Sequence, residues 1–247
     1  MAEIVGHRGA SHDAPENTLP AVKLGFEQGA DAVEVDVFAT ADGRIVAIHD
    51  PHTKRVAGVK LDVAKSTLAD LRKLDVGSWK GERWAGTVIP TLEEVLEAVP
   101  EGRRLMIEVK CRVSALPNLE RAIEGSGKRE RVALISFSYP LIGQAKRMMP
   151  DVPAYWVYGF SVRERARWGN PTMQGLIRKA ETAGLDGLDL DGQGPITKAF
   201  VDKLRAKGME LYVWTVNDPN RARELIAMGV KGITTDRPGY LRQQLGL

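Results

Sequence analysis

Three acidic side chains stand at spacings that would gather them on one face of a sheet. Glu34 and Asp36 alternate with valines, and Glu108 precedes Lys110 by two residues in a similar apolar run. Side chains two apart in a β-strand point to the same face, and buried carboxylates are costly unless a cation neutralises them. No lysine cluster matches them, so Glu34, Asp36 and Glu108 predict a site for a hard cation. Oxygen-only ligands suit Mg²⁺ or Ca²⁺ rather than zinc.

A second group of residues suits phosphate binding and proton transfer. The segment Gly6–Gly9 reads Gly-His-Arg-Gly, in which Arg8 offers a planar fork for a phosphate or a carboxylate. Flanking glycines let the backbone approach a ligand closely. His7 and His49 carry imidazoles that titrate near neutral pH, so beside a metal–carboxylate cluster they would supply an acid and a base. Each histidine taken alone is equally compatible with a structural role.

Several other polar or aromatic residues admit both functional and structural interpretations. Asp189 and Asp191 repeat the two-residue spacing, but a salt bridge or a solvated strand end explains them equally well. Trp214 is expected to face the interior of the fold, where it would wall a substrate pocket, meet a cationic head group or simply fill the core. His12 and His52 fall in expected loops, and we interpret both as solvated.

Two further segments lie beside expected element ends. Asn17 or Thr18 is suited to cap the helix that follows, which gives this segment a structural interpretation. Asp236 follows the last expected strand, and we expect it to orient a neighbouring side chain such as Arg8 or Arg237. Neither segment by itself indicates a particular chemistry.

The elements that would position these residues alternate regularly along the chain. Short apolar runs indicate strands at Glu3–Gly6, Ala32–Val37, Ile45–His49, Leu105–Val109, Val132–Ser136, Ala154–Val157, Gly187–Leu190, Leu211–Thr215 and Gly232–Thr234. Amphipathic segments indicate helices at Leu19–Gln28, Leu92–Ala98, Leu119–Glu124, Pro140–Met149, Thr172–Ala183, Thr197–Lys207 and Pro219–Met228. This alternation predicts a parallel sheet covered by helices.

An eight-stranded barrel can form only if one of the nine expected strands is not part of the parallel sheet. Only seven residues separate Val37 from Ile45, whereas a parallel crossover needs a dozen or more. The connection must be a hairpin turning at Asp42-Gly43, which returns His49 to about the level of Glu34. The remaining strands predict a (β/α)₈ TIM barrel, with functional residues at the C-terminal strand ends.

We expect residues 1–247 to form one domain with a small insertion at about 50–89, a segment that fits no simple strand–helix unit. A short helical stretch near Leu68–Leu74 is expected within it. Mobile connections are expected at Gly125–Lys128 and Gly159–Gly169.

Composition narrows the function classes further. The 247 residues carry a net charge of +3 without a basic run, which argues against a nucleic-acid partner. One cysteine and four histidines exclude an internal disulfide and a Cys/His zinc framework. The chain shows no signal peptide and no apolar stretch long enough for a transmembrane segment. Together with the lone cysteine, Cys111, this favours a cytoplasmic location.

Motifs in a fixed order resemble the glycerophosphodiester phosphodiesterase family. They span nearly the whole chain, and the ordered set is far more specific than any one of them. The matching segments are His7-Arg8-Gly9, Pro15-Glu16-Asn17-Thr18, Glu34-Val35-Asp36-Val37, Thr40-Ala41-Asp42-Gly43, His49-Asp50, Pro90-Thr91-Leu92, Glu108-Val109-Lys110, Ser136-Phe137, Trp214-Thr215-Val216-Asn217 and Thr235-Asp236-Arg237-Pro238.

The resemblance implies an enzyme that hydrolyses glycerophosphodiesters, such as glycerophosphocholine or glycerophosphoethanolamine, to an alcohol and glycerol 3-phosphate. It implies a divalent cation, Mg²⁺ or Ca²⁺, and a monomeric or homodimeric protein acting on a small molecule. The residues that match the family's motifs would act as the acid–base pair (His7 and His49), the metal ligands (Glu34, Asp36 and Glu108), the phosphate contacts (Arg8 and Lys110) and the wall of the glycerol pocket (Trp214). The sequence departs from the family's common pattern at Ser11-His12-Asp13 and in the segment after Asp50. Both segments border the mouth of the site, so the resemblance does not specify which alcohol is released.

Other functions remain to be weighed against this one. Lipid phosphodiesterases that use two histidines on similar barrels are the nearest alternatives. A non-catalytic phosphate-binding barrel would be expected to lack a histidine or a carboxylate of the site, and none is missing. An isomerase or aldolase barrel would show a Gly-rich phosphate loop near the last strands, where only the short Gly229–Gly232 occurs, and no isolated lysine suits a Schiff base.

Overall fold

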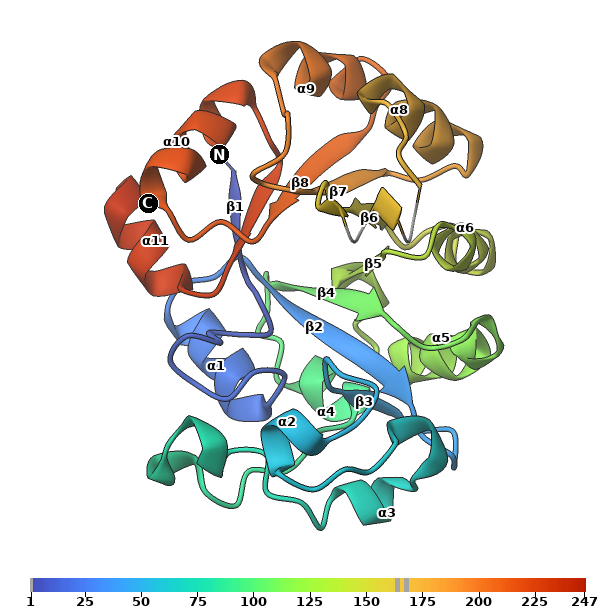
Figure 1. Ribbon diagram of the computed structural model, residues 1–247, viewed down its shortest axis with the longest axis vertical. Helices are drawn as coiled ribbons and strands as arrows, with labels where there is room; N and C mark the ends of the chain where they lie inside the picture. Colours follow the sequence, from blue (N-terminus) through green and yellow to red (C-terminus); the bar gives the residue numbers. More distant parts are fainter. Residues whose placement is uncertain (1, 163–164, 167–168) are drawn as a thin grey trace.

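Eight parallel strands close into a barrel in the computed structural model, which describes residues 2–162, 165–166 and 169–247. The order around the barrel is β1-β9-β8-β7-β6-β5-β4-β2, and β1 pairs with β2 to close the ring (Figure 1). The (β/α)₈ prediction is therefore confirmed. The strands are β1 Glu3–Gly6, β2 Ala32–Ala39, β3 Ile45–Ala47, β4 Arg104–Val109, β5 Val132–Ser136, β6 Ala154–Tyr158, β7 Gly187–Asp191, β8 Glu210–Trp214 and β9 Gly232–Thr235.

The ninth strand, β3, forms the hairpin that the short connection requires. Val37 pairs with Ala47 in antiparallel register. The strand ends at Ala47, two residues before the predicted end, but the backbone N–H of Ile48 still donates to the carbonyl of Asp36 at 2.9 Å. Continued by two residues, this register brings His49 level with Val35, next to Glu34, as expected.

Helices cover the outside of the barrel (Figure 1). The amphipathic segments are confirmed as helices, but α5 begins three residues early because Pro117 suits its first turn. Sequence analysis did not indicate α11, although it has a proline in its first turn and ends at Gly246, whose φ is +68°. The covering helices are α1 Leu19–Glu27, α4 Leu92–Glu97, α5 Leu116–Gly125, α6 Tyr139–Met148, α8 Met173–Thr182, α9 Lys198–Arg205, α10 Pro219–Met228 and α11 Pro238–Leu245.

Strand alternation divides the core into two layers. Outward-facing residues of the strands, such as Val33, Val35 and Ile107, pack against the helices. Inward-facing residues form a smaller cluster inside the barrel that includes Tyr155 and Tyr212. Glu34, Asp36 and Glu108 alternate with the outward-facing residues, so the register places their side chains inside the barrel.

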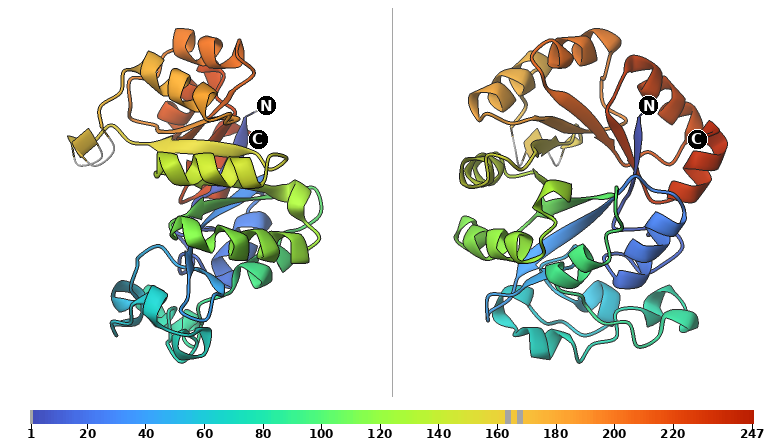
Figure 2. Two further views of the ribbon diagram at one scale, coloured as in Figure 1. Left: turned by 90° about the vertical axis from the view of Figure 1, so that its right-hand side faces the viewer. Right: turned by 180° about the vertical axis from the view of Figure 1, so that it is seen from behind.

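The segment between β3 and α4 has an apolar cluster of its own. It contains only short helices, and its buried residues are anchored on the hairpin through Val46 and Ile48. Figure 2 (left) shows this segment projecting from the end of the barrel opposite the N-terminus. The helices are α2 Lys54–Ala57, η1 Val63–Lys65, α3 Leu68–Leu71, η2 Ser78–Lys80 and η3 Glu82–Trp84. Part of the expected mobile connection at 159–169, including Trp168, lies outside the described residues.

Side chains close the N-terminal end of the barrel. Arg104 forms an ion pair with Glu3, and its Nη2 donates to the hydroxyl oxygen of Tyr212 at 2.7 Å. The Tyr155 hydroxyl donates to Glu210 at 2.6 Å, and Lys231 pairs with the same carboxylate at 2.9 Å. These interactions close the N-terminal end of the barrel, so a ligand would enter from the C-terminal end of the strands.

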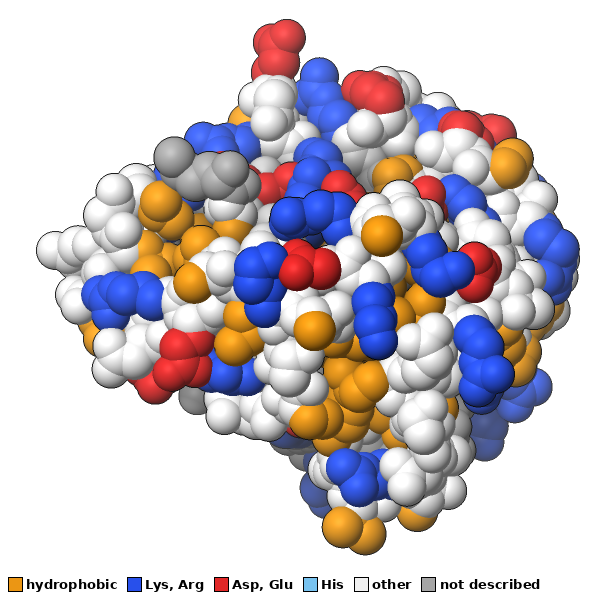
Figure 3. Space-filling view, turned by 90° about the horizontal axis from the view of Figure 1, so that it is seen from above, with side chains coloured by type: hydrophobic (Ala, Val, Ile, Leu, Met, Phe, Trp, Pro, Cys, Tyr) orange, Lys and Arg blue, Asp and Glu red, His pale blue; other side chains and the backbone are white. Residues whose placement is uncertain are grey.

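Charged side chains are dispersed over the face drawn in Figure 3, where basic, acidic and neutral groups alternate. That face shows no continuous basic surface of the kind that nucleic-acid binding requires. In the part of the chain that the structure describes, no helix is long and apolar enough to cross a membrane.

Candidate active site

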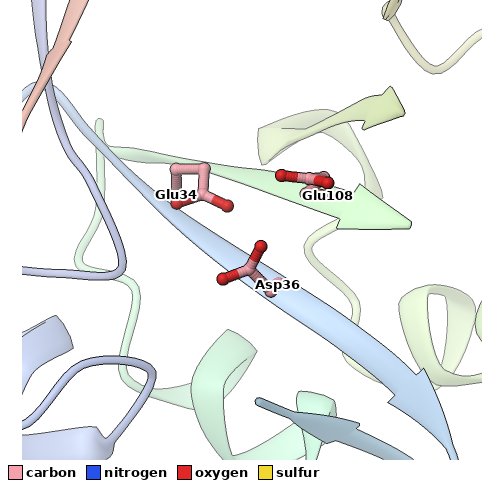
Figure 4. Close-up of side chains that lie close together, drawn as sticks. All are labelled: Glu34, Asp36 and Glu108. Atoms are coloured by element: carbon pink, nitrogen blue, oxygen red, sulfur yellow. The ribbon is translucent and has the colours of Figure 1, made fainter. Parts of the chain in front are cut away.

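Three carboxylates converge inside the C-terminal half of the barrel (Figure 4). Glu34 and Asp36 come from β2, and Glu108 comes from β4, where it stands beside Asp36 in the parallel register. One oxygen from each carboxylate can be chosen so that all lie within 4.8 Å of one another. Glu34 and Asp36 are buried, and the Glu108 side chain is 12% exposed.

Two cations compensate this negative charge in part. Lys110 Nζ lies 2.9 Å from Asp36 Oδ1 and 3.2 Å from Glu108 Oε1, while Arg8 Nε lies 3.1 Å from Asp36 Oδ2. Burial would raise the pKa of Asp36, but Lys110 and Arg8 outweigh it and hold that pKa well below its usual range. Lys110 therefore lies within the carboxylate cluster. Sequence analysis did not predict this, because it treated the three carboxylates as having no matching lysine cluster.

The other two carboxyl groups remain under-compensated. Burial and repulsion from Asp36 raise the pKa of Glu108 to about 8. Burial, with repulsion from Asp36 and Glu108, raises the pKa of Glu34 well above its usual value. Glu34 Oε2 accepts the backbone N–H of Arg8 at 2.9 Å, but its buried Oε1 has no hydrogen-bond partner. An unpaired buried oxygen among three carboxylates fits a hard divalent cation such as Mg²⁺ or Ca²⁺.

Each of the two histidines at the site is held by a carboxylate. His7 Nδ1–H donates to Asp236 Oδ1 at 2.7 Å, and Asp236 also accepts from Ser11 and Asn217. Asp236 therefore orients neighbouring side chains, as expected, but these are His7, Ser11 and Asn217 rather than Arg8 or Arg237. β9 pairs with β1 through Thr235 and Gly6, so the residue after β9 meets the residue after β1, which is His7.

His49 is held from its own loop. Its Nδ1–H donates to Asp50 Oδ1 at 2.8 Å. Burial lowers the pKa of His49, and the nearby positive charges of Arg8 and Lys110 lower it further, although Asp36 and Asp50 oppose this effect. The His49 imidazole is therefore neutral at neutral pH, with Nδ1 protonated and Nε2 left as the basic nitrogen.

The backbone around Arg8 and Asn17 is unusual. Both residues have positive φ, +54° and +58°, which is uncommon for residues with a side chain. Gly9, with φ +87°, lies so close to α1 that a Cβ would approach the backbone of Ala21 to 2.4 Å. The Asn17 amide donates to Asp36 Oδ2 at 2.8 Å and its carbonyl accepts the Asp36 N–H at 2.9 Å, so Thr18 and not Asn17 caps α1.

An arginine of the inserted segment connects the two carboxylates that hold Arg8 and His49. Arg55, on α2, donates to Glu16 through both terminal nitrogens at 2.8 and 2.9 Å, and to Asp50 Oδ2 through Nε at 2.7 Å. Glu16 also accepts from Arg8 at 2.8 Å, and Asp50 holds His49. The sequence motifs include Glu16 and Asp50, but only the structure shows that Arg55, 39 residues from Glu16, connects them.

Replacing Arg55 with Ala is expected to lower kcat without unfolding the protein. The Arg55 side chain is 41% exposed, so its ion pairs contribute little stability, but they fix the carboxylates that orient His49 and Arg8. We expect a loss of roughly tenfold, less than the ~10²-fold that a 1 Å misplacement can cause. Steady-state kinetics and a thermal melt would measure both effects, with Arg72→Ala, which breaks a surface pair with Glu94, as the matched control. Equal kinetics for wild type and Arg55→Ala would contradict this role.

A cavity of about 270 Å³ joins these groups at the C-terminal end of the barrel. Trp214 lies on its wall, where its ring meets Phe137 edge to face at 5.3 Å and its Nε1–H donates to the Asp189 carbonyl at 3.2 Å. A larger hollow of about 470 Å³ lies at the other end, beside the segments that precede β8 and β9, and contains none of the candidate residues. The lining of the smaller cavity is His7, Arg8, Glu34, His49, Glu108, Lys110, Ile135, Phe137, Val157, Asp189, Trp214, Thr215 and Thr234.

The remaining candidates fall outside this cavity. Asp191 accepts the N–H of Gln193 at 2.9 Å in a local turn. His12 is about half exposed and donates to Asp13, as a loop residue should. His52 is solvated only in part. The residue is half-buried in the inserted segment, its Nδ1 is buried, and its backbone forms an isolated antiparallel β-bridge with Asp62. Burial raises the pKa of the Cys111 thiol to about 11, which leaves it unreactive.

Comparison with known proteins connects this geometry to a family. Residues 7–240 match the model of the glycerophosphoryl diester phosphodiesterase family. A glycerophosphodiester phosphodiesterase of Caldanaerobacter subterraneus subsp. tengcongensis is 33% identical over 243 residues, covering 96% of this chain and 95% of that protein. One of Bacillus altitudinis is 30% identical over 244 residues, covering 96% of each.

Solved structures of phosphodiesterases have the same fold as this chain. An Oleispira antarctica phosphodiesterase, determined in complex with the product sn-glycerol-3-phosphate, superposes with a TM-score of 0.86 at 25% identity, covering 100% of this chain and 98% of that one. A Thermotoga maritima glycerophosphodiester phosphodiesterase superposes with a TM-score of 0.78 at 26% identity, covering 98% of each chain. Since the family match extends over most of the barrel and both curated relatives cover nearly its full length, this chain belongs to the glycerophosphodiester phosphodiesterase family.

Proposed function

We propose that this enzyme hydrolyses glycerophosphodiesters, such as glycerophosphocholine or glycerophosphoethanolamine, to an alcohol and glycerol 3-phosphate. The observation that carries the proposal is one cavity lined by two carboxylate-held histidines, two cationic side chains, and Glu34 and Glu108 of the carboxylate cluster, whose third member, Asp36, is paired with both cations behind the lining. The product bound to the Oleispira antarctica phosphodiesterase is glycerol 3-phosphate, which supports the same product here.

Arg8 and Lys110 bind the phosphate in this proposal. Both line the cavity, and their side chains are 19% and 18% exposed, so they meet an entering anion without full solvation. A phosphodiester carries one negative charge. Negative charge grows on the non-bridging oxygens as the nucleophile attacks, and it passes to the oxygen of the leaving alcohol as that bond breaks. Fixed cations facing those oxygens stabilise the transition state because they need no reorganisation during the reaction.

His49 and His7 move the protons. The lowered pKa of His49 leaves its Nε2 free to accept the proton of the nucleophile. His7, held through Nδ1 by Asp236, delivers a proton to the departing alkoxide from Nε2. The carboxylate on Nδ1 fixes the orientation of the ring and leaves Nε2 as the nitrogen that meets the substrate.

Glu34, Asp36 and Glu108 would hold a divalent cation, Mg²⁺ or Ca²⁺. Such a cation would supply Lewis-acid polarisation of the phosphate and neutralise part of its charge. The chain's own contribution is the arrangement of the ligands. Asn17 fixes Asp36, and the backbone N–H of Arg8 fixes Glu34 Oε2, which leaves Oε1 unpaired.

Two nucleophiles are compatible with this arrangement. The glycerol 2-hydroxyl would give a cyclic phosphate first, whereas water would give glycerol 3-phosphate directly. Hydrolysis in ¹⁸O-labelled water with rapid quenching separates the routes. A trapped cyclic phosphate supports the first, and label in the first-formed product without any cyclic species excludes it.

An assay of glycerophosphocholine and glycerophosphoethanolamine tests the proposed reaction. Glycerol 3-phosphate should form in equal amount to choline or ethanolamine, as measured by enzymatic detection of both products. Bis(4-nitrophenyl) phosphate serves as a control diester without glycerol. Hydrolysis of the control with no release of glycerol 3-phosphate from either glycerophosphodiester would overturn the proposal while leaving a phosphodiesterase.

A further inference from the structure

A buried carboxyl group on β7 has no assigned role in the reaction as proposed. Asp189 is 2% exposed and lines the cavity, and among the residues that the structure describes its buried Oδ1 has no hydrogen-bond partner. Leaving a buried polar atom unpaired destabilises the fold. An unpaired polar atom inside a cavity therefore indicates that an atom of the ligand forms the missing hydrogen bond.

The neighbouring side chains do not offer that partner. In the strand register, Val157 on β6 and Tyr212 on β8 flank Asp189. Val157 is apolar, and the Tyr212 hydroxyl is engaged with Glu3 and Arg104 at the closed end of the barrel. The cations of the site pair elsewhere, Arg8 with Glu16 and Asp36, and Lys110 with Asp36 and Glu108.

A second unpaired polar atom lies in the same cavity. Thr234, on β9, is 2% exposed, and its buried Oγ1 also lacks a hydrogen-bond partner. β8 lies between β7 and β9, so Asp189 and Thr234 come from strands on either side of it. Ile135, Phe137 and Trp214 add apolar and aromatic surface to the wall of the same cavity. A small ligand part with both apolar surface and a hydroxyl group matches this composition.

Depth within the cavity separates the two halves of a diester. The side chains of Arg8, Lys110 and His49 are 19%, 18% and 32% exposed, which places the phosphate and proton-transfer groups nearer the mouth. Asp189 and Thr234, each 2% exposed, are more deeply buried than these groups. The alcohol varies among glycerophosphodiesters, so it suits the mouth, whereas the constant glycerol moiety suits the more deeply buried groups.

We infer that Asp189, together with Thr234, binds the terminal hydroxyl of the glycerol moiety and thereby makes glycerol diesters better substrates than diesters that lack this hydroxyl. The inference deepens the proposed function and rests on it. A carboxyl–hydroxyl contact requires no charge on Asp189. Burial and repulsion from Glu108 raise the pKa of Asp189 well above its usual value, which favours a neutral carboxyl that both donates and accepts.

Kinetics on two matched substrates test the inference. One is glycerophosphocholine, and the other is its analogue without the terminal hydroxyl, which keeps both choline and the hydroxyl next to the phosphate ester. Wild type should prefer glycerophosphocholine by roughly 10- to 100-fold in kcat/KM. Asp189→Leu should bring this ratio close to one by slowing only glycerophosphocholine, and Asp189→Asn and Thr234→Val should give intermediate ratios.

Asp191→Asn is the matched control, because Asp191 lies on the same strand but outside the cavity, and it should keep the wild-type ratio. Thermal melts verify folding, and if Asp189→Leu does not fold, the other two variants carry the test. An unchanged ratio in folded variants, an equal loss on both substrates, or a loss that excess Mg²⁺ or Ca²⁺ reverses overturns the inference. Wild type that hydrolyses both substrates equally also overturns it and leaves the proposed function standing, whereas wild type that hydrolyses neither removes the proposed function itself.

Discussion

Replacing His49 or His7 with Ala is expected to lower kcat by ~10²–10⁴-fold, the usual contribution of general acid–base catalysis. Both rings line the cavity, and each donates Nδ1–H to a carboxylate, so each presents its other nitrogen for proton transfer. KM should change little, because Arg8 and Lys110 remain to bind the phosphate. Steady-state kinetics with glycerophosphocholine measures both constants.

His12→Ala is the control for this experiment. His12 also donates Nδ1–H to a neighbouring carboxylate, Asp13, but it is half exposed and lies outside the cavity, so its loss should leave kcat unchanged. Wild-type turnover in either His7→Ala or His49→Ala would remove that residue from the acid–base pair. A loss expressed only in KM would instead make it a binding residue.

The pH dependence separates the two roles further. Burial lowers the pKa of His49, so its imidazole loses its proton below the usual value of 6.5. If His49 is the base, kcat/KM of wild type should rise as pH increases through that lowered pKa and then level off. An acidic limb centred well above pH 6.5 would contradict the assignment of the base to His49.

Much of the fold follows from periodicity in the sequence. Alternating valines around Glu34 and Asp36 give the direction of each side chain once the segment is recognised as a strand. The seven residues between Val37 and Ile45 exclude a parallel crossover and so give the hairpin that returns His49. Sequence analysis missed helix α11 because the helix has only eight residues, and its apolar spacing from Leu241 to Leu245 covers a single turn, which is too short for a clear period.

The connections within the site depend on closure of the barrel. Asp236 reaches His7 across 229 residues because β9 pairs with β1, and no local pattern reveals which side chain the closed ring will bring to it. Arg55 reaches Glu16 from a short helix in an irregular segment, where neither strand nor helix period gives a direction. The sequence therefore indicates the groups that do chemistry more readily than the groups that hold them.

Removing divalent cations with EDTA is expected to abolish hydrolysis, and adding Mg²⁺ or Ca²⁺ should restore it. The reason lies in the carboxylate cluster, where Lys110 and Arg8 compensate Asp36 but leave Glu34 Oε1 unpaired. A cation there relieves repulsion among the carboxylates, so it should also raise the melting temperature. Full activity in EDTA would remove the cation from the reaction.

Proton release gives a readout of the cation site that does not depend on activity. Burial and repulsion raise the pKa of Glu108 to about 8 and that of Glu34 well above its usual value, so at pH 7 protons compete with the cation for these oxygens. Apparent affinity should therefore increase as pH rises from about 6 to 8, with protons released on binding. Calorimetry at pH 7 in two buffers of different ionisation enthalpy counts the protons.

The same pKa shift predicts how stability without a cation depends on pH. A carboxyl whose folded-state pKa is raised binds protons more tightly in the folded protein, so its contribution to stability is lost as pH rises from the unfolded value, near 4.5, to about 8 for Glu108. Glu108→Gln carries no charge at this position and should lose less stability over that range. Asp191→Asn, outside the cavity, should follow wild type. If cation binding released no proton and wild type and Glu108→Gln melted in parallel across this range, the carboxylates would already be ionised, and the cation would have to bind without displacing protons from Glu108.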